Sequence, residues 1–389
     1  MQVPFLALDR DYRAVEDDVR ARFERVLESQ VFVLGEETRA LEHAIESVAG
    51  ARYAVACSSG TEALSLALLA LGIGRGDAVM VPTFTFVATA GAVHHAGAVP
   101  IFADIDAATF NSGADEIHTA IDRWCERTPD GLRHRGSGAR VRALVAVHLF
   151  GRAASMAAIG EVASEHGLRI IEDGAQAIGA VGDRGPVGSW GAAGCFSFYP
   201  TKNLGGAGDG GAVTTGDEER AARLRRLRTH GAEAGAYVHD ECGVNARIGE
   251  LQAAYLNAKL SFLDDWTRAR GRVAALYRER LGALAAAGAI ELAADAEPPA
   301  HVFHQLVVRV GRDRDGVRRR MSARGVETRV FYPLPLHLQP CFAYSGHVEG
   351  DFPAAERAAR EVLALPIHPW LGADGVDAVC RALAASVGE

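Results

Sequence analysis

One lysine, Lys202, stands in a segment whose composition is typical of a chemical site. It lies within FSFYPTKNLGGAGDGGAV, residues 196–213, between a short aromatic run and a glycine-rich loop. Of the 41 Lys plus Arg residues in the chain, only Lys202 and Lys259 are lysines. An arginine guanidinium stays protonated, whereas a lysine amine that loses its proton can condense with a carbonyl to form a Schiff base. No other charged residue occurs between residue 196 and Asp209. This neutral neighbourhood predicts a carbonyl-condensing amine rather than a solvated surface cation.

A second segment could bind an anion. The apolar run Tyr53–Cys57 predicts a strand, and the polar turn SSGT follows it before a helix expected over residues 62–71. A strand, a small polar turn and a helix direct backbone N–H groups and a hydroxyl toward one point, where the helix N-terminus favours negative charge. Gly60 and Thr61 are therefore candidate phosphate ligands. An ordinary helix N-cap in the same turn is the alternative.

Two further positions follow the ends of predicted strands. Asp173 comes directly after the strand expected over residues 168–172, with Gln176 shortly beyond it. A carboxylate at the end of a buried apolar strand is costly unless it meets a cation or donors, so Asp173 could pair with a buried positive charge or cap a helix. Phe86 lies beyond the strand over residues 78–81, where its ring could stack on a flat ligand or belong to the core.

Pyridoxal phosphate requires this combination of groups. Its phosphate needs donors, its ring a planar face, its aldehyde an amine, and its pyridine nitrogen a carboxylate that keeps it protonated. These groups are supplied by Gly60-Thr61, Phe86, Asp173, the hydroxyl of Ser197 and Lys202. No single residue is specific, but their joint occurrence at strand ends predicts a pyridoxal phosphate site.

Alternating strands and helices must position these residues. The expected strands cover residues 53–57, 78–81, 98–103, 142–149, 168–172 and 210–215. This order predicts an α/β fold with a mostly parallel central sheet, in which ligands bind at the carboxyl ends of the strands. Residues 112–140 are expected to form a helix that ends in a surface loop without chemistry.

The pattern changes after a long helix expected over residues 248–263. A helix over 267–287, a strand over 301–310 and helices over 314–324 and 353–363 predict a smaller α+β unit. We therefore expect a large domain over residues 1–255, including the N-terminal helices, and a small C-terminal domain over residues 256–389. The proline-rich segment YPLPLH is expected to be an ordered loop that displays His337.

Composition argues against several other classes of protein. The 389 residues carry a formal net charge of −8, which gives no electrostatic support for binding nucleic acid or an anionic membrane. The six cysteines are scattered, no apolar run approaches a membrane span, and the N-terminus does not read as a signal peptide. We therefore expect a cytoplasmic protein. His301 and His304 would point to opposite faces of a strand, so no metal site is expected.

Along nearly its full length the chain resembles the DegT/DnrJ/StrS family of pyridoxal-phosphate-dependent nucleotide-sugar aminotransferases. The matching segments are VPFLALDRDY, SSGTEAL, VPTFTFVATA, VHLFG, IIEDGAQAIGA, FSFYPTKNLGGAGDGGAV, GVNARIGELQAA and FYPLPLHLQP. The resemblance implies the aspartate aminotransferase fold (fold type I) and a homodimer whose active sites lie at the subunit interface. It also implies an amino-acid donor, usually glutamate, and a keto-sugar acceptor linked to a nucleotide.

The same motifs imply roles for individual residues. Lys202 would carry the cofactor as a Schiff base and move the proton during amino transfer, and Asp173 would pair with the pyridinium nitrogen. Phe86 would stack on the ring, while Gln176 would contact its outer face.

The resemblance also assigns the phosphate and substrate contacts. The phosphate would be bound by Gly60, Thr61 and Ser197, and Asn245 would reach the phosphate of the neighbouring subunit's cofactor. Tyr199 and His337 would lie on the substrate side.

Several functions stay open at this point. Some relatives have histidine at the position of Lys202 and catalyse dehydration, so lysine favours amino transfer. The alternatives are an aminotransferase for a non-nucleotide keto-cyclitol, an aromatizing dehydratase, and a non-catalytic regulatory or binding protein that retains the fold. The motifs lean slightly toward a 3-keto rather than a 4-keto sugar and leave the nucleotide, dTDP or UDP, undecided.

Overall fold

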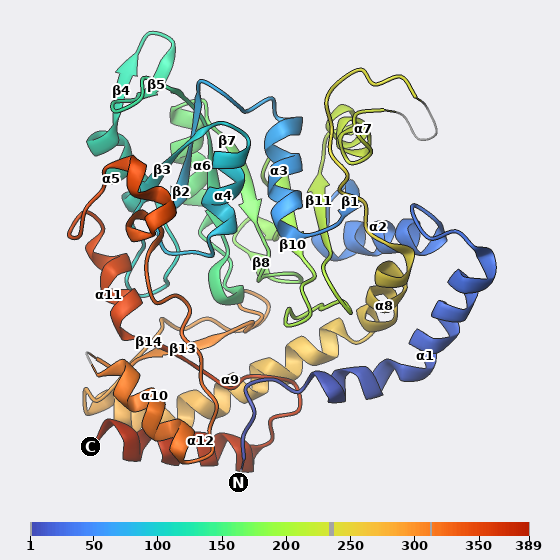
Figure 1. Ribbon diagram of the computed structural model, residues 1–389. Coiled ribbons are helices and arrows are strands. Elements are labelled where there is room, and N and C mark those ends of the chain that lie inside the picture. Colours follow the sequence, from blue (N-terminus) through green and yellow to red (C-terminus); the bar gives the residue numbers. More distant parts are fainter. Residues whose placement is uncertain (1, 233–236, 312, 389) are drawn as a thin grey trace.

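The computed structural model describes residues 2–232, 237–311 and 313–388, and is built around one large mixed sheet (Figure 1). This nine-stranded sheet follows the order β1-β11-β10-β7-β6-β2-β3 along its main path. The seven strands of this path are β1 (Tyr53–Cys57), β2 (Asp77–Pro82), β3 (Val99–Ala103), β6 (Arg140–Val147), β7 (Arg169–Asp173), β10 (Ala193–Ser197) and β11 (Gly211–Thr215).

Most of these strands run in one direction. The pairs β10–β7, β7–β6, β6–β2 and β2–β3 are parallel, whereas β11 is antiparallel to both of its neighbours, β10 and β1. The carboxyl ends of β1, β2, β6, β7 and β10 therefore meet at one edge of the sheet, which is where open α/β sheets bind ligands. The expected α/β fold with a mostly parallel sheet is confirmed.

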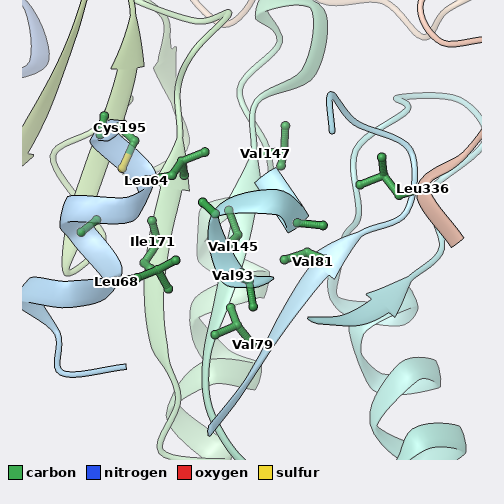
Figure 2. Packing of buried hydrophobic residues seen from close by; sticks show 14 of the residues in the cluster. Leu64, Leu68, Val79, Val81, Val93, Val145, Val147, Ile171, Cys195 and Leu336 are labelled. Atoms are coloured by element: carbon green, nitrogen blue, oxygen red, sulfur yellow. The ribbon is translucent and has the colours of Figure 1, made fainter. Parts of the chain in front are cut away.

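Helices cover both faces of the sheet, because its strands are apolar on both sides. One face is covered by α3 (Gly60–Ala70) and α4 (Ala88–His95), and the other by α5 (Ala114–Trp124) and α6 (Met156–Glu165). Figure 2 shows the first of these layers, in which Leu64, Leu68 and Val93 of the helices pack against Val79, Val81, Val145, Val147 and Ile171 of the strands. This core fixes the helix N-termini relative to the strand ends.

The remaining helices of this half lie at its margins. They are α1 (Leu8–Ser29), α2 (Glu36–Ala49), α7 (Glu218–Leu227) and α8 (Glu250–Leu260). Helix α8 packs beside α1 and α2, and the long helix α9 (Leu263–Ala286) leads from it toward the C-terminal part of the chain (Figure 1). The predicted domain boundary after residue 255 lies within α8 and stays a prediction.

The C-terminal part contains a second, smaller sheet. It is antiparallel, in the order β12 (Glu291–Leu292), β13 (Leu306–Arg309) and β14 (Val362–Leu365). Helices α10 (Arg314–Ala323), α11 (Pro353–Glu361) and α12 (Ala373–Val387) accompany it, and α12 packs on α9 and α10. No helix among the described residues combines the length and apolar character needed to cross a membrane.

Several predicted elements were wrong in detail. Residues 112–140 do not end in a surface loop, because β4 (Cys125–Thr128) and β5 (Gly131–His134) form a hairpin whose second strand pairs with β6. Gly131, the first residue of β5, has φ 109°, a conformation that glycine tolerates best. A further small hairpin joins β8 (Val181–Gly182) to β9 (Gly185–Pro186).

Other boundaries also differ from the sequence-based expectation. The strand expected over 301–310 is confined to β13, and the helix expected to reach residue 363 gives way to β14 at Val362. Helix α9 begins at Leu263, earlier than expected. Residues 336–345 form two short 3-10 turns, Leu336–Leu338 and Pro340–Ser345, and a third covers Leu149–Gly151.

Candidate active site

A cavity of about 500 Å³ opens at the carboxyl edge of the large sheet. It is lined by most of the residues that the sequence predicted, namely Gly60, Thr61, Phe86, Asp173, Gln176, Ser197, Tyr199 and Lys202. These residues come from the ends of β1, β2, β7 and β10 and the turns that follow them. Parallel strands thus gather residues that lie more than 100 positions apart in the sequence at one site.

Lys202 lies in the turn after β10 and faces this cavity. Its backbone N–H donates to the carbonyl oxygen of Tyr199 at 2.8 Å, which closes the turn. Burial lowers the pKa of Lys202 from the ordinary value of 10.5 to about 8, and the negative charge of Asp173 opposes part of that shift. A substantial fraction of the amine is therefore neutral near pH 8 and can act as a nucleophile.

Asp173 closes β7 and is held by two donors. The hydroxyl of Thr89 donates to Oδ2 at 2.8 Å, and the N–H of Ala175 donates to Oδ1 at 3.2 Å. Only 6% of Asp173 is exposed, so the carboxylate has a fixed position deep in the cavity. Residues 174–180 form turns rather than a helix, which removes the helix N-cap alternative.

The turn between β1 and α3 is both a helix N-cap and part of the cavity wall, which are the two roles considered from the sequence. Ser59 is the N-cap of α3, since its Oγ accepts from the N–H of Glu62 at 3.1 Å, and the same turn lines the cavity. Gly60 lies so close to β10 that a Cβ on it would be 2.5 Å from Cβ and 3.0 Å from Oγ of Ser197. The absence of a side chain at Gly60 thus lets the helix N-terminus and the Ser197 hydroxyl face one point, as phosphate binding requires.

This close approach gives a testable prediction. Gly60→Ala is expected to force the turn away from Ser197, to cost about 1–3 kcal/mol of folding free energy and to weaken cofactor affinity about tenfold. Gly216→Ala is the matched control, because nothing lies within 4 Å of the added Cβ there. Equilibrium unfolding and cofactor titration of both variants would check this, and equal affinities would refute it.

Two aromatic rings and a side-chain amide form another wall of the cavity. Phe86 is 54% exposed, and its ring centroid lies 6.1 Å from that of Tyr332. Gln176 is fixed at both ends, since its Oε1 accepts from the N–H of Phe150 at 2.6 Å and its Nε2 donates to the Tyr332 hydroxyl at 3.0 Å. Phe86 therefore offers an open ring face to the cavity, and Tyr332 is a cavity residue that the sequence interpretation missed.

His148 is a second residue without an assigned role in the sequence. Its Nδ1 accepts from the N–H of Ala154 at 3.0 Å, so its Nε2 carries the hydrogen that it donates to Glu172 at 3.2 Å. Burial alone would raise the pKa of Glu172, but the bonds from His148 and from backbone N–H groups, Gly191 among them at 2.7 Å, lower it. This network supports the β6 and β7 ends beneath the cavity.

The C-terminal part of the chain contributes His304, which the sequence analysis considered only as a metal ligand and rejected in that role. His304 lines the cavity, and its Nδ1 lies 3.3 Å from Oδ1 of Asn203, the residue after Lys202. Burial, followed by the positive charge of Lys202, lowers the pKa of His304 well below its usual value. Its imidazole is therefore neutral at neutral pH.

The remaining predicted residues lie in different surroundings. Tyr199 is 52% exposed and lines the cavity, whereas Asn245 is exposed outside it, with its Oδ1 accepting from Nε of Arg247 at 3.0 Å. Nothing in one chain tests whether Asn245 reaches a neighbouring subunit, so that role stays a prediction.

His337 is not displayed on its loop, contrary to expectation. It is 1% exposed, and its Nδ1 lies 2.8 Å from Oγ1 of Thr83 while its Nε2 lies 3.2 Å from Oε1 of Glu356. Because both ring nitrogens are engaged, His337 holds the loop to the end of β2 and does not line the cavity. The proline-rich loop turns inward so that this polar side chain finds partners.

One group away from the cavity has the composition of a metal site. Side-chain donor atoms of His118, Glu165 and His166 lie within 4.8 Å of one another. Glu165 is also paired with Arg127, whose Nη2 is 3.7 Å from Oε1, so its carboxylate is partly neutralised already. The expected absence of a metal stays a prediction.

Comparison with known proteins places the chain in a family. A sequence profile of the DegT/DnrJ/EryC1/StrS aminotransferase family matches residues 14–384. The chain belongs to this family. It is 41% identical over 372 residues to the UDP-N-acetyl-3-dehydro-α-D-glucosamine 3-aminotransferase of Acidithiobacillus ferrooxidans, covering 95% of this chain and 94% of the relative. It is also 40% identical over 371 residues to the pleiotropic regulatory protein of Geobacillus stearothermophilus, covering 95% of both.

A solved structure agrees with this placement. The crystal structure of S. venezuelae DesV in complex with a ketimine intermediate superposes with a TM-score of 0.90 at 39% identity, over 100% of this chain and 99% of that one. The expected fold type I architecture is confirmed. The protein is an aminotransferase of the DegT/DnrJ/EryC1/StrS family, and its cofactor is pyridoxal phosphate.

The cavity residues of this family member fit that cofactor. A buried carboxylate, a helix N-terminus opened by Gly60, an exposed aromatic face and an amine of lowered pKa lie around one space. Each matches one chemical need of the cofactor: the pyridine nitrogen, the phosphate, the ring and the aldehyde.

Proposed function

We propose that the protein transfers an amino group from an amino acid, with L-glutamate the expected donor, to a nucleotide-linked keto sugar. The observation that carries this proposal is the placement of Lys202, with its pKa lowered to about 8, in one cavity with the buried carboxylate of Asp173. The 41% identical relative from A. ferrooxidans is named for a UDP-linked 3-keto sugar and supports a nucleotide-linked acceptor.

The chain's own residues account for the steps of such a transfer. When bound, the cofactor supplies an aldehyde that condenses with amines and a ring that accepts electrons. With cofactor and donor bound, Lys202 Nζ would take the proton from the donor's α carbon and deliver it at the cofactor's C4′ atom. Asp173, held in place by Thr89 and Ala175, would keep a proton on the pyridine nitrogen.

Other residues bind and orient rather than react. Gly60, Thr61 and Ser197 would bind the phosphate at the N-terminus of α3, where the helix dipole favours an anion. Phe86 would offer its ring face to the cofactor ring, and Gln176, held by Phe150 and Tyr332, would contact that ring as well. Tyr199 contacts the substrate at the mouth of the cavity.

The proposal includes an assembly and a location. The protein acts as a homodimer with shared active sites, in which Asn245 reaches the phosphate bound by the neighbouring subunit. The exposed position of Asn245, outside the cavity of its own chain, supports this role. A cytoplasmic location agrees with the need for a nucleotide-linked substrate.

One relative's name favours a second candidate function. The G. stearothermophilus relative is named a regulatory protein, which keeps a non-catalytic role in view. The amine, the carboxylate and the opened helix N-terminus in one cavity favour catalysis, because a binding protein has no need of a nucleophilic lysine. A keto-cyclitol acceptor would change only the substrate of the amino transfer, whereas an aromatizing dehydration would be a different reaction on the same cofactor.

An absorbance experiment tests the proposal. The purified protein with pyridoxal phosphate is expected to show a visible cofactor band that glutamate converts to a band at shorter wavelength. UDP- and dTDP-linked 3-keto and 4-keto sugars and a keto-cyclitol are then added to the converted protein, and the productive acceptor restores the visible band. A protein that gains no visible band with the cofactor would contradict the enzymatic function, and one indifferent to glutamate would favour another donor or dehydration.

A further inference from the structure

The second lysine of the chain, Lys259, is buried against the loop that carries the first. Lys259 lies on α8 and is 2% exposed. Its Nζ donates to the carbonyl oxygen of Gly205 at 2.8 Å. The rings of Tyr255 and Trp266 flank the ammonium, with their centroids 5.5 and 5.4 Å from Nζ. Both lysines of the chain are thus associated with one loop, residues 199–210.

Gly205 is the point at which this loop folds back on itself. A Cβ on Gly205 would clash with the carbonyl group of Pro200 and would lie 3.1 Å from the carbonyl oxygen of Lys202. The next residue, Gly206, donates its N–H to the carbonyl oxygen of Phe198 at 2.8 Å. The position of Gly205 therefore determines the path of the backbone around Lys202.

Helix α8 supports the same loop at a second point. The side chain of Gln252 lies against Gly206 and Gly208, since a Cβ there would be 2.9 Å from its Oε1 and 2.8 Å from its Nε2, respectively. Helix α8 is itself anchored, because the carboxylate of Glu250 accepts from the N–H groups of Gly35 at 2.8 Å and Glu37 at 2.9 Å. The loop thus rests on a helix that is fixed to α2.

Holding a loop with a buried ammonium costs desolvation free energy. Desolvation by burial lowers the pKa of Lys259 from 10.5 to about 8, with Asp11 opposing this shift and Arg270 adding to it. An apolar side chain of similar length would fill the same space between the two rings without that penalty. A methionine, however, could make neither the hydrogen bond to Gly205 nor the cation–π contacts with the two rings, and of these interactions only the hydrogen bond reaches the loop of Lys202.

We propose that Lys259 is a positioning residue for the reaction at Lys202, which it serves by fixing the Gly205 carbonyl and so the turn that aims the reacting amine into the cavity. This inference rests on the proposed role of Lys202. It assigns Lys259 no contact with the cofactor or the substrate. Loss of its hydrogen bond is expected to let the loop relax and water reach Lys202.

The two lysines allow a direct test on the cofactor-free protein. Labelling with lysine enriched in ¹³C at Cε gives two side-chain signals, and Lys259→Met assigns them by removing one. In wild type both signals are expected to titrate well below the ordinary lysine value. In Lys259→Met the signal of Lys202 is expected to titrate nearer that value, and capture of pyridoxal phosphate to slow about tenfold. Tyr255→Phe, which keeps the ring beside Lys259, is expected to match wild type in both measurements.

The outcomes separate this inference from the proposed function. An unchanged Lys202 titration and capture rate in folded Lys259→Met would overturn it. If that variant does not fold, Lys259→Gln, whose amide can donate to Gly205 without a charge, assigns the signals in its place. A wild-type Lys202 titration and capture rate are expected in Lys259→Gln, and a Lys202 signal at the ordinary lysine value there would overturn the inference. A wild-type protein that captures no cofactor would contradict the proposed function instead, while the titrations would still report on the loop.

Discussion

Lys202→Ala is expected to abolish covalent capture of pyridoxal phosphate and to slow amino transfer by a factor of about 10³ to 10⁴. Both effects have one cause, because the same Nζ condenses with the cofactor and moves the proton. In wild type, capture is expected to accelerate as the pH rises through about 8, because the fraction of neutral amine grows around the lowered pKa of Lys202. Borohydride reduction and mass spectrometry measure the adduct, and single-turnover kinetics measure the transfer.

Lys202→Arg is the matched control, since it keeps a cation at the same position but cannot condense with an aldehyde. It is expected to lose capture as completely as the alanine variant, which would separate nucleophilicity from charge. Because the chain has only one other lysine, peptide mapping of wild type needs to distinguish only residues 202 and 259. An adduct at Lys259, or full capture by either Lys202 variant, would contradict the assignment.

The sequence was sufficient to predict the part of the site that depends on strand ends. Asp173 ends β7, Gly60 and Lys202 lie in the turns that follow β1 and β10, and parallel strands place their carboxyl ends at one edge of a sheet. Local sequence patterns alone therefore predict that such residues lie close together in the fold. Lysine in an arginine-rich chain and an acid at the end of a buried strand also stand out by their chemistry.

The part of the site that depends on packing between distant segments could not be predicted. Tyr332 reaches the cavity through a loop, and His304 lies just before β13, so no local pattern relates them to Lys202. His337 shows the converse error, because a polar residue in a proline-rich loop suggests exposure until Thr83 and Glu356 are known to lie beside it. The β4–β5 hairpin, by contrast, has a local signal in the turn sequence Pro129-Asp130-Gly131.

The lysine alone does not explain catalysis, because the charge that develops on the substrate carbon must be accepted by the ring. Asp173→Asn is expected to retain the covalent adduct at Lys202 but to slow amino transfer about 10³-fold. Asparagine has nearly the same shape and can still accept from the Thr89 hydroxyl, but it carries no charge to keep a proton on the pyridine nitrogen. Stopped-flow absorbance with glutamate measures capture and transfer separately.

Thr89→Val provides the graded control for this carboxylate. It removes the donor 2.8 Å from Oδ2 and leaves the charge and the N–H of Ala175, so a loss of about tenfold is expected, as for one hydrogen bond. If Asp173→Asn transferred amino groups within tenfold of wild type, the carboxylate would be a structural ligand of Thr89 and Ala175 rather than the partner of the ring. If Thr89→Val were as slow as Asp173→Asn, orientation of the carboxylate would matter as much as its charge, because a free rotamer would no longer direct an oxygen at the ring nitrogen.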